Sequence, residues 1–198
     1  MTALISRLKF GPVLLVGSML AISSALSGCT AIVGAGATVG VAAAQERGIK
    51  GRAKDLQVEA LVLEKFLKAG FKLTTTIGAE VYEGRVLLTG ASTDTKITDQ
   101  AVKLTWQVDG VKEVLNEIQV GVDSGISDIA QDSWITAQIK SKMTFDQNIL
   151  SINYVVETVN RTVYLIGIAQ NQTEFNRVKQ LAAQIKFVRD VISHVRIK

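Results

Sequence analysis

The fold is decided by the stretch Val86-Leu87-Leu88-Thr89-Gly90, because Val163-Tyr164-Leu165-Ile166-Gly167 repeats its character 77 residues later. The same shift aligns residues 55–120 with residues 132–197 without a gap. A long internal match of this kind indicates two copies of one structural unit. We therefore expect two similar domains in tandem.

Apolar residues keep their register in the first part of each copy. They recur every four residues, which predicts one face of an amphipathic helix. The matched pairs are Val58 and Ile135, Val62 and Ile139, and Phe66 and Met143. Identical acidic residues accompany them, since Asp55 matches Asp132 and Glu80 matches Glu157.

Two β-rich runs, a second helix and a final strand follow in each copy. The two runs lie close enough to form a hairpin, and the final strand alternates apolar and polar residues. In the first copy these elements are expected over residues 73–82, 85–89, 94–108 and 114–120, and in the second over residues 150–157, 161–168, 171–185 and 191–197. The expected order is αββαβ, twice.

Two motifs of the first copy carry a family resemblance: Gly84-x-Val86-x-Leu88-x-Gly90, and Asp109-Gly110-Val111-x-x-Val114-x-Asn116. Together they are similar to the signature of the BON domain, a periplasmic αββαβ module. The resemblance implies an α+β fold with two tandem BON domains, over residues 51–121 and 129–198. Each domain would be a three-stranded mixed sheet packed on two helices, with the linker at residues 121–128.

The second copy departs from these motifs at two turns. Asn160-Arg161-Thr162 stands where the first copy has its hairpin glycine, and Phe187 stands where it has Gly110. Because both changes fall in turns, they put the conformation of those loops in question rather than the fold.

The N-terminal residues 1–28 have the features of a secretory signal peptide. Arg7 and Lys9 precede an apolar run that is short for a spanning helix, which needs about 20 apolar residues. Leu26-Ser27-Gly28-Cys29 resembles the bacterial lipobox, which implies cleavage after Gly28, a diacylglyceryl group on the Cys29 thiol and acylation, as by palmitate, of the new amine. An ordinary signal peptide with a chance cysteine is the alternative. Residues 29–50 would then be a flexible spacer rich in glycine and alanine.

The charge of the remaining chain is nearly balanced. Residues 1–28 contain two basic residues and no acidic one, so removing them leaves 20 basic and 18 acidic residues. This balance argues against bulk nucleic-acid binding, which depends on many phosphate contacts. It still permits a local basic face that meets anionic lipid.

Few residues are suited to catalysis or to metal binding. The chain has one histidine, His194, and one cysteine, Cys29. Alternation along the final strand places His194 on the face opposite Val191 and Val195. With Cys29 consumed by lipid, no Cys/His nucleophile pair or histidine-rich metal site can form. We expect no enzymatic activity, no metal and no cofactor.

Trp134 is the strongest candidate for a binding residue. It lies one residue outside the apolar register of its helix, and its counterpart in the first copy is the polar Gln57. A tryptophan at a partly hydrated position suits a membrane interface, and lysines near it could meet lipid phosphates. The candidate lipid-binding residues are Ser133, Trp134, Lys140, Ser141 and Lys142. The alternative is that Trp134 packs between the two domains.

A lipobox, a small-residue spacer and tandem BON domains together resemble the division- and outer-membrane-stress-associated lipid-binding lipoproteins. That resemblance implies anchoring in the outer membrane, facing the periplasm. It also implies binding of anionic phospholipid, such as phosphatidylglycerol or cardiolipin, through the second domain in support of envelope integrity. The alternative is a structural module that holds an envelope protein partner, because an apolar surface suited to lipid is equally suited to protein.

Three apolar side chains lead to further expectations. Leu61 and Leu63 match the polar Gln138 and Lys140, so we expect the sister domain or the spacer to cover them. Trp106 lies beside an apolar helix position, and we expect it in the core or at the domain interface.

Overall fold

The computed structural model describes residues 45–122 and 124–198. The expected signal peptide, Cys29 and residues 30–44 of the expected spacer lie outside the described residues. None of the helices in the described ranges is both long and apolar enough to span a membrane.

The first domain contains three helices and one three-stranded sheet. Its elements are α2 (Gly48–Ala69), α3 (Phe71–Thr76), β1 (Ile77–Tyr82), β2 (Arg85–Ser92), α4 (Thr95–Thr105) and β3 (Glu113–Val120). The central strand β2 pairs antiparallel with β1 and parallel with β3. The sheet is therefore mixed, as expected.

The second domain repeats this order. Its elements are α5 (Ile126–Phe145), a short 3-10 turn (Ser151–Asn153), β4 (Tyr154–Val159), β5 (Thr162–Ala169), α6 (Gln172–Ala183) and β6 (Asp190–Ile197). Strand β5 pairs antiparallel with β4 and parallel with β6. The two tandem αββαβ units predicted from the repeat are confirmed.

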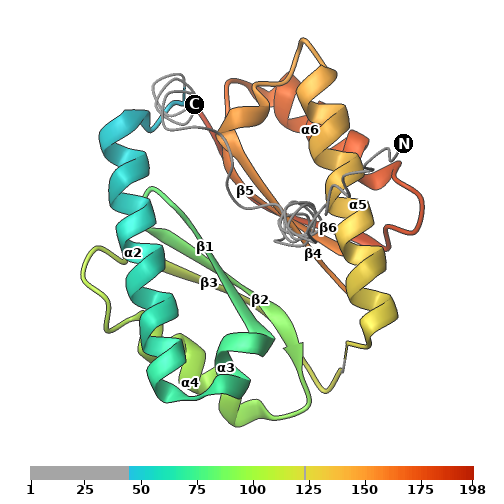
Figure 1. Cartoon of the computed structure of the whole chain (residues 1–198). Coiled ribbons are helices and arrows are strands. Elements are labelled where there is room, and N and C mark those ends of the chain that lie inside the picture. The colour runs from blue at the N-terminus through green and yellow to red at the C-terminus, as the bar shows by residue number, and fades with distance from the viewer. Residues whose placement is uncertain (1–44, 123) are drawn as a thin grey trace, which may run out of the picture.

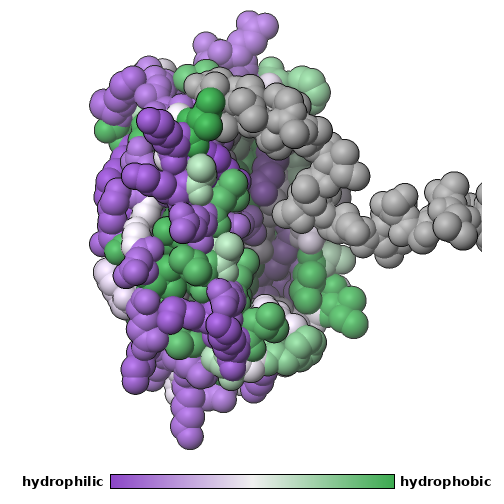
Figure 2. All heavy atoms as spheres, turned by 60° about the vertical axis from the view of Figure 1, so that its left-hand side comes forward, coloured by the Kyte–Doolittle hydropathy of each residue, from purple (hydrophilic) through white to green (hydrophobic). Residues whose placement is uncertain are grey.

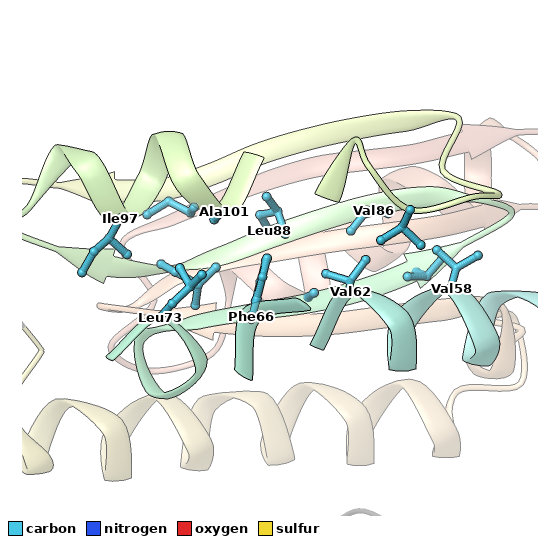
Figure 3. Packing of buried hydrophobic residues seen from close by; sticks show 13 residues of the cluster. Val58, Val62, Phe66, Leu73, Val86, Leu88, Ile97 and Ala101 are labelled. Atoms are coloured by element: carbon cyan, nitrogen blue, oxygen red, sulfur yellow. The ribbon is translucent and has the colours of Figure 1, made fainter. Parts of the chain in front are cut away.

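The apolar face of α2 forms the core of the first domain. Val58, Val62 and Phe66 lie one turn apart and are at most 6% exposed. They pack with Val86 and Leu88 of the sheet in one cluster (Figure 3). Burying each such side chain contributes on the order of 2 kcal/mol, so this cluster stabilises the domain. Residues of α5, β5 and α6 form the corresponding core of the second domain.

One aspartate in each domain fixes the hairpin turn. Asp55 accepts hydrogen bonds from the backbone N–H groups of Glu83 and Gly84, both at 2.9 Å. Asp132 accepts the corresponding two hydrogen bonds from the backbone N–H groups of Asn160 and Arg161, at 2.7 and 2.8 Å.

All four of these turn residues have positive φ: 56° and 78° in the first domain, and 47° and 66° in the second. Arg161 therefore adopts the left-handed conformation that Gly84 has in the first domain, and the turn is the same in both domains.

The two sheets pack face to face, with the helices on the outside (Figure 1). Tyr82, Leu87, Tyr164 and Ile166 form the centre of an apolar cluster between the sheets. These side chains point away from the helices of their own domain, because successive residues of a strand face opposite sides. The contact between the domains is therefore built from strand residues.

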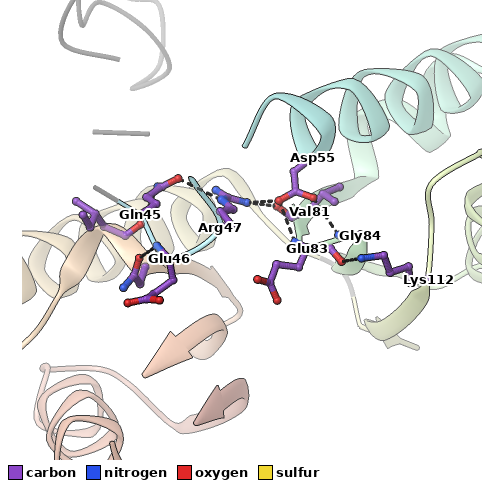
Figure 4. Close-up of polar contacts among 10 residues, drawn as sticks. Gln45, Glu46, Arg47, Asp55, Val81, Glu83, Gly84 and Lys112 are labelled. Carbon is purple, nitrogen blue, oxygen red and sulfur yellow. Dashed lines mark hydrogen bonds and ion pairs between the residues drawn. The ribbon is translucent and has the colours of Figure 1, made fainter. Parts of the chain in front are cut away.

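Polar residues 45–47, immediately before α2, connect the two domains (Figure 4). Gln45 Nε2 donates to the carbonyl of Ile152 at 2.7 Å, and the Glu46 N–H donates to Asn153 Oδ1 at 3.0 Å.

Arg47 turns the other way, into the first domain. It pairs with Asp55 at 2.6 Å, donates to the Val81 carbonyl at 2.9 Å and lies 4.3 Å from the centre of the Tyr82 ring. Residues 45–47, which were expected to belong to a flexible spacer, thus contact both domains.

Two local expectations are wrong. Residues 73–76 are helical rather than the start of a strand, because Gly70, with φ of 145°, ends α2 and the chain forms one more helical stretch before β1. Trp106 is 54% exposed in the turn after α4 rather than buried. Leu61 and Leu63 are each 36% exposed, so neither is fully exposed. Their cover by residues 30–44 of the spacer stays a prediction, because those residues lie outside the described ones.

Candidate functional site

The structure places the five candidate residues on two sides of α5. Trp134, Ser141 and Lys142 lie on the side that faces α6 and the loop after it, whereas Ser133 and Lys140 lie toward strand β4. The division follows from helix geometry, because successive residues are rotated by about 100°. All five are exposed.

An exposed aromatic pair lies on the α6 side of α5. The rings of Trp134 and Phe187 meet edge to face, with centroids 6.0 Å apart and planes inclined by 66°. Trp134 is 44% exposed and Phe187 45%. Trp134 is not among the residues of the cluster between the two sheets. The pair therefore presents aromatic surface to solvent.

The backbone of Phe187 holds its ring in this position. Phe187 has φ of +74°, in the left-handed region, and its counterpart Gly110 has φ of +96°. A bulky residue in this region costs on the order of 1 kcal/mol relative to glycine, and such strain concentrates at functional positions. The second domain thus keeps the turn of the first and adds an aromatic ring to it.

A cationic group lies close to the aromatic pair. Lys186 Nζ is 4.6 Å from the centre of the Phe187 ring. A cation over an aromatic ring is attracted by the negative face of the ring. The end of this loop therefore combines an apolar surface with positive charge.

An open depression of about 750 Å³ continues along the same side, between α5 and α6. Ser141, Lys142 and Phe145 line it from α5, and Leu181 lines it from α6. Phe145 is 82% exposed.

At one edge of this depression, Arg177 pairs with Asp146 at 2.6 Å. The hydrogen bond from Arg177 keeps the pKa of Asp146 below its usual value. At neutral pH the Asp146 carboxylate is therefore ionised, and the depression has one negative charge beside its basic and apolar side chains.

The two remaining candidates have contacts of their own on the opposite side of α5. Lys140 Nζ lies 3.7 Å from Glu157 Oε1, and Ser133 Oγ donates to the Ile129 carbonyl at 2.8 Å. Burial raises the pKa of Glu157, and the charge and hydrogen bond of Lys140 oppose that shift. The ion pair with Glu157 places Lys140 away from the aromatic pair. Ser133 lies seven residues before Lys140, two helical turns away, and therefore on the same side of α5.

Three residues near the aromatic pair and the depression were not predicted from the sequence: Phe145, Lys186 and Phe187. A signal was present for Phe187, because it replaces a glycine of the repeat, but the change was interpreted only as a question about loop conformation. Phe145 replaces the charged Lys68 of the first copy, which is the same kind of signal. No group of three histidine, cysteine or carboxylate side chains that could hold a metal ion occurs within residues 45–122 and 124–198.

Comparison with known families gives the origin of the two domains. The BON domain matches residues 54–122 and 131–198. The chain belongs to the BON domain family. The two matched ranges correspond to the two αββαβ units, so the resemblance seen in the motifs is confirmed over both domains.

Three curated relatives are similar to this chain over most of its length. An "Uncharacterized protein in gshII 5'region" of Anaplasma centrale is 43% identical over 143 residues, which cover 71% of this chain and 95% of that protein. "Outer membrane lipoprotein DolP" of Haemophilus influenzae is 36% identical over 124 residues, covering 63% of this chain and 64% of the relative. A "21 kDa hemolysin" of Actinobacillus pleuropneumoniae is 31% identical over 152 residues, covering 74% and 78%. The chain is thus a tandem BON protein similar to DolP.

Proposed function

We propose that this protein is an outer-membrane lipoprotein, anchored through Cys29, whose second BON domain binds anionic phospholipid and thereby supports the cell envelope. The similarity to a relative named as an outer-membrane lipoprotein supports the location. The lipobox-like sequence before Cys29 supports the anchor. The role is one of binding rather than catalysis.

The observation that carries the lipid-binding proposal is the exposed pair of Trp134 and Phe187 beside Lys186. Both aromatic residues replace small or polar residues of the first copy, so neither is needed to build the fold. Aromatic rings with one apolar and one hydrated side favour the membrane–water interface. Lysines close to an anionic surface each contribute about 1 kcal/mol.

The positions of the candidate residues favour a smaller site than the five residues together. Trp134, Lys142, Phe145 and Phe187 share the side of α5 that faces α6, and this surface could rest on a membrane as a unit. Ser141 also lines the depression. Lys140 and Ser133 lie outside this surface, so we expect them to contribute less.

The proposal is tested by co-sedimentation of the protein lacking residues 1–29 with vesicles. We expect binding to phosphatidylglycerol or cardiolipin vesicles, weak binding to phosphatidylcholine vesicles, and a decrease with added salt. Trp134→Gln introduces the residue of the first copy and should lower the apparent affinity about tenfold, which corresponds to about 1.4 kcal/mol.

Trp106→Gln is the matched control, because Trp106 is a similarly exposed tryptophan in the first domain. It should leave vesicle binding unchanged. Equal losses for the two variants, or binding that neither affects, would show that the assigned surface is wrong. Binding of an envelope protein, and not of lipid, at Trp134 would support the alternative role of a protein-holding module.

A further inference from the structure

A continuous apolar stripe runs along the outer side of α2. Its residues are spaced alternately by four and three, at Ile49, Ala53, Leu56, Ala60, Leu63 and Leu67. All six are exposed, and the four large ones have exposed fractions of 48%, 46%, 36% and 61%. We call these six residues the α2 seam. Figure 2 shows hydrophobic side chains among hydrophilic ones on the side of the molecule to which α2 belongs.

The fold does not require this seam. Three of its six positions are polar or charged in α5, with Ser133 for Leu56, Lys140 for Leu63 and Thr144 for Leu67, and the other three keep the same residue. Helix α5 nevertheless packs on its sheet in the same way as α2, through a separate buried face. An exposed apolar stripe that the fold does not need is typical of an interaction surface.

The spacing of the seam favours a helix as the partner. Alternating steps of three and four residues produce a narrow stripe with a period of 3.5, which is the pattern of one helix packed along another. A helix that lies on a membrane presents a wider apolar face. On α2, Lys50 and Glu64 lie beside the seam on its solvent side, and both are exposed.

The charges beside the seam are complementary to a second copy of α2 that runs in the opposite direction. Lys50 and Glu64 occupy equivalent heptad positions at opposite ends of the helix. In an antiparallel pair these positions meet each other. Lys50 of each copy would face Glu64 of the other, and the two-fold symmetry makes this contact twice. Glu64 already pairs with Lys68 one turn further along α2, and its second carboxylate oxygen leaves room for another donor.

We infer that two copies of this protein associate through the α2 seam, with their α2 helices antiparallel. The large residues of one copy then lie against the small ones of the other: Leu56 against Ala60, and Leu63 against Ala53. Gln57 falls close to the two-fold axis, opposite Gln57 of the second copy. The association uses the first domain and leaves Trp134 and Phe187 of the second domain available.

Crosslinking of the full-length protein in cell envelopes tests this inference. Gln57→Cys places a thiol near the two-fold axis, and a short bismaleimide should convert it to a covalent dimer. Lys54→Cys is the matched control, because Lys54 is exposed on another side of the same helix. Wild-type protein, in which Cys29 is the one cysteine, gives the background level of crosslinking. Dimer formation by Gln57→Cys at no more than the level of Lys54→Cys would overturn the inference.

The charge pair tests the direction of the helices. In the Gln57→Cys protein, Lys50→Glu or Glu64→Lys alone should reduce the crosslinked dimer several-fold, and the two together should restore it. Restoration requires that the two positions meet between copies. Failure of the double variant to restore the dimer, with an unchanged circular dichroism spectrum and melting temperature, would rule out antiparallel pairing. A crosslink to a different protein instead would also overturn the inference.

Discussion

His194 and Glu117 occupy the same position in the two copies of the repeat, 77 residues apart, and their side chains contact each other at 2.8 Å. Glu80 and Glu157 are a second pair of equivalent residues that interact across the domain interface. Equivalent positions meet in this way when two similar units are related by a two-fold axis. The two BON domains of one chain are therefore arranged like the subunits of a symmetric dimer.

The Glu80–Glu157 pair should make stability depend on pH. Burial, together with the nearby carboxylates of Glu157 and Glu59, raises the pKa of Glu80 to about 7, and Lys140 and Arg52 oppose this shift only partly. A carboxyl whose pKa is higher in the folded state stabilises the fold at low pH. That contribution is lost as the pH rises from about 4.5 to about 7.

Glu80→Gln should abolish the loss of stability that Glu80 causes as the pH rises. At pH 8 the variant should have a higher free energy of unfolding than the wild type, by at most about 3 kcal/mol, and the two should converge near pH 4.5. Urea denaturation at several pH values measures the difference. Asp99→Asn, at an exposed position, is the control. A wild-type pH slope that persists in Glu80→Gln would contradict the assignment to this carboxyl.

Asp132→Ala should destabilise the protein by about 2–3 kcal/mol, because two backbone N–H groups of the β4–β5 turn lose a charged acceptor. Asp55→Ala should cost more, about 3–5 kcal/mol, because it also leaves the buried Arg47 without its ion-pair partner. Denaturant unfolding measures both variants, with the exposed Ser133→Ala as a control. Equal losses for the two aspartates would show that the Arg47 pair adds little.

Arg47→Ala should also destabilise the protein, but its effect should not add to that of Asp55→Ala. The two side chains form one buried ion pair at 2.6 Å, and residues in direct contact give non-additive changes. We expect the double variant to be less destabilised than the sum of the single variants by at least about 1 kcal/mol. A double-mutant cycle based on urea unfolding measures this coupling, and strict additivity would argue against it.

Phe187→Gly should separate lipid binding from stability. Glycine relieves the positive φ of +74°, so the free energy of unfolding should stay constant or rise by up to about 1 kcal/mol. Binding to phosphatidylglycerol vesicles should fall, because one ring of the aromatic pair is lost. Thermal melting and vesicle co-sedimentation measure the two effects. A destabilised variant with unchanged lipid binding would indicate that Phe187 serves packing alone.

The internal repeat made the fold of each domain predictable. Conserved spacing at Val58, Val62 and Phe66, with their counterparts in the second copy, located the core face of each first helix. The match of Asp55 with Asp132 was visible as well, although its role in the hairpin turn was not. That role depends on a turn 28 residues away along the chain.

The arrangement of the two domains was less accessible from the sequence. Tyr82 and Tyr164 resemble ordinary strand residues, and alternation alone does not say whether their face meets solvent or another sheet. Contact between Trp134 and Phe187 brings together α5 and the loop after α6, a pairing that periodicity does not predict. Gln45, Glu46 and Arg47 have the composition of a solvated spacer, so their long-range contacts could not be recognised.

The contacts of residues 45–47 have a mechanical consequence. The chain N-terminal to Gln45 is joined to the second domain by Gln45 and Glu46, and to the first domain by Arg47. Glu46 also pairs with Lys198, the last residue of the sequence, at 3.1 Å. We therefore expect both domains to share any tension along the N-terminal segment at their junction, so that the first helix is not peeled away from its sheet.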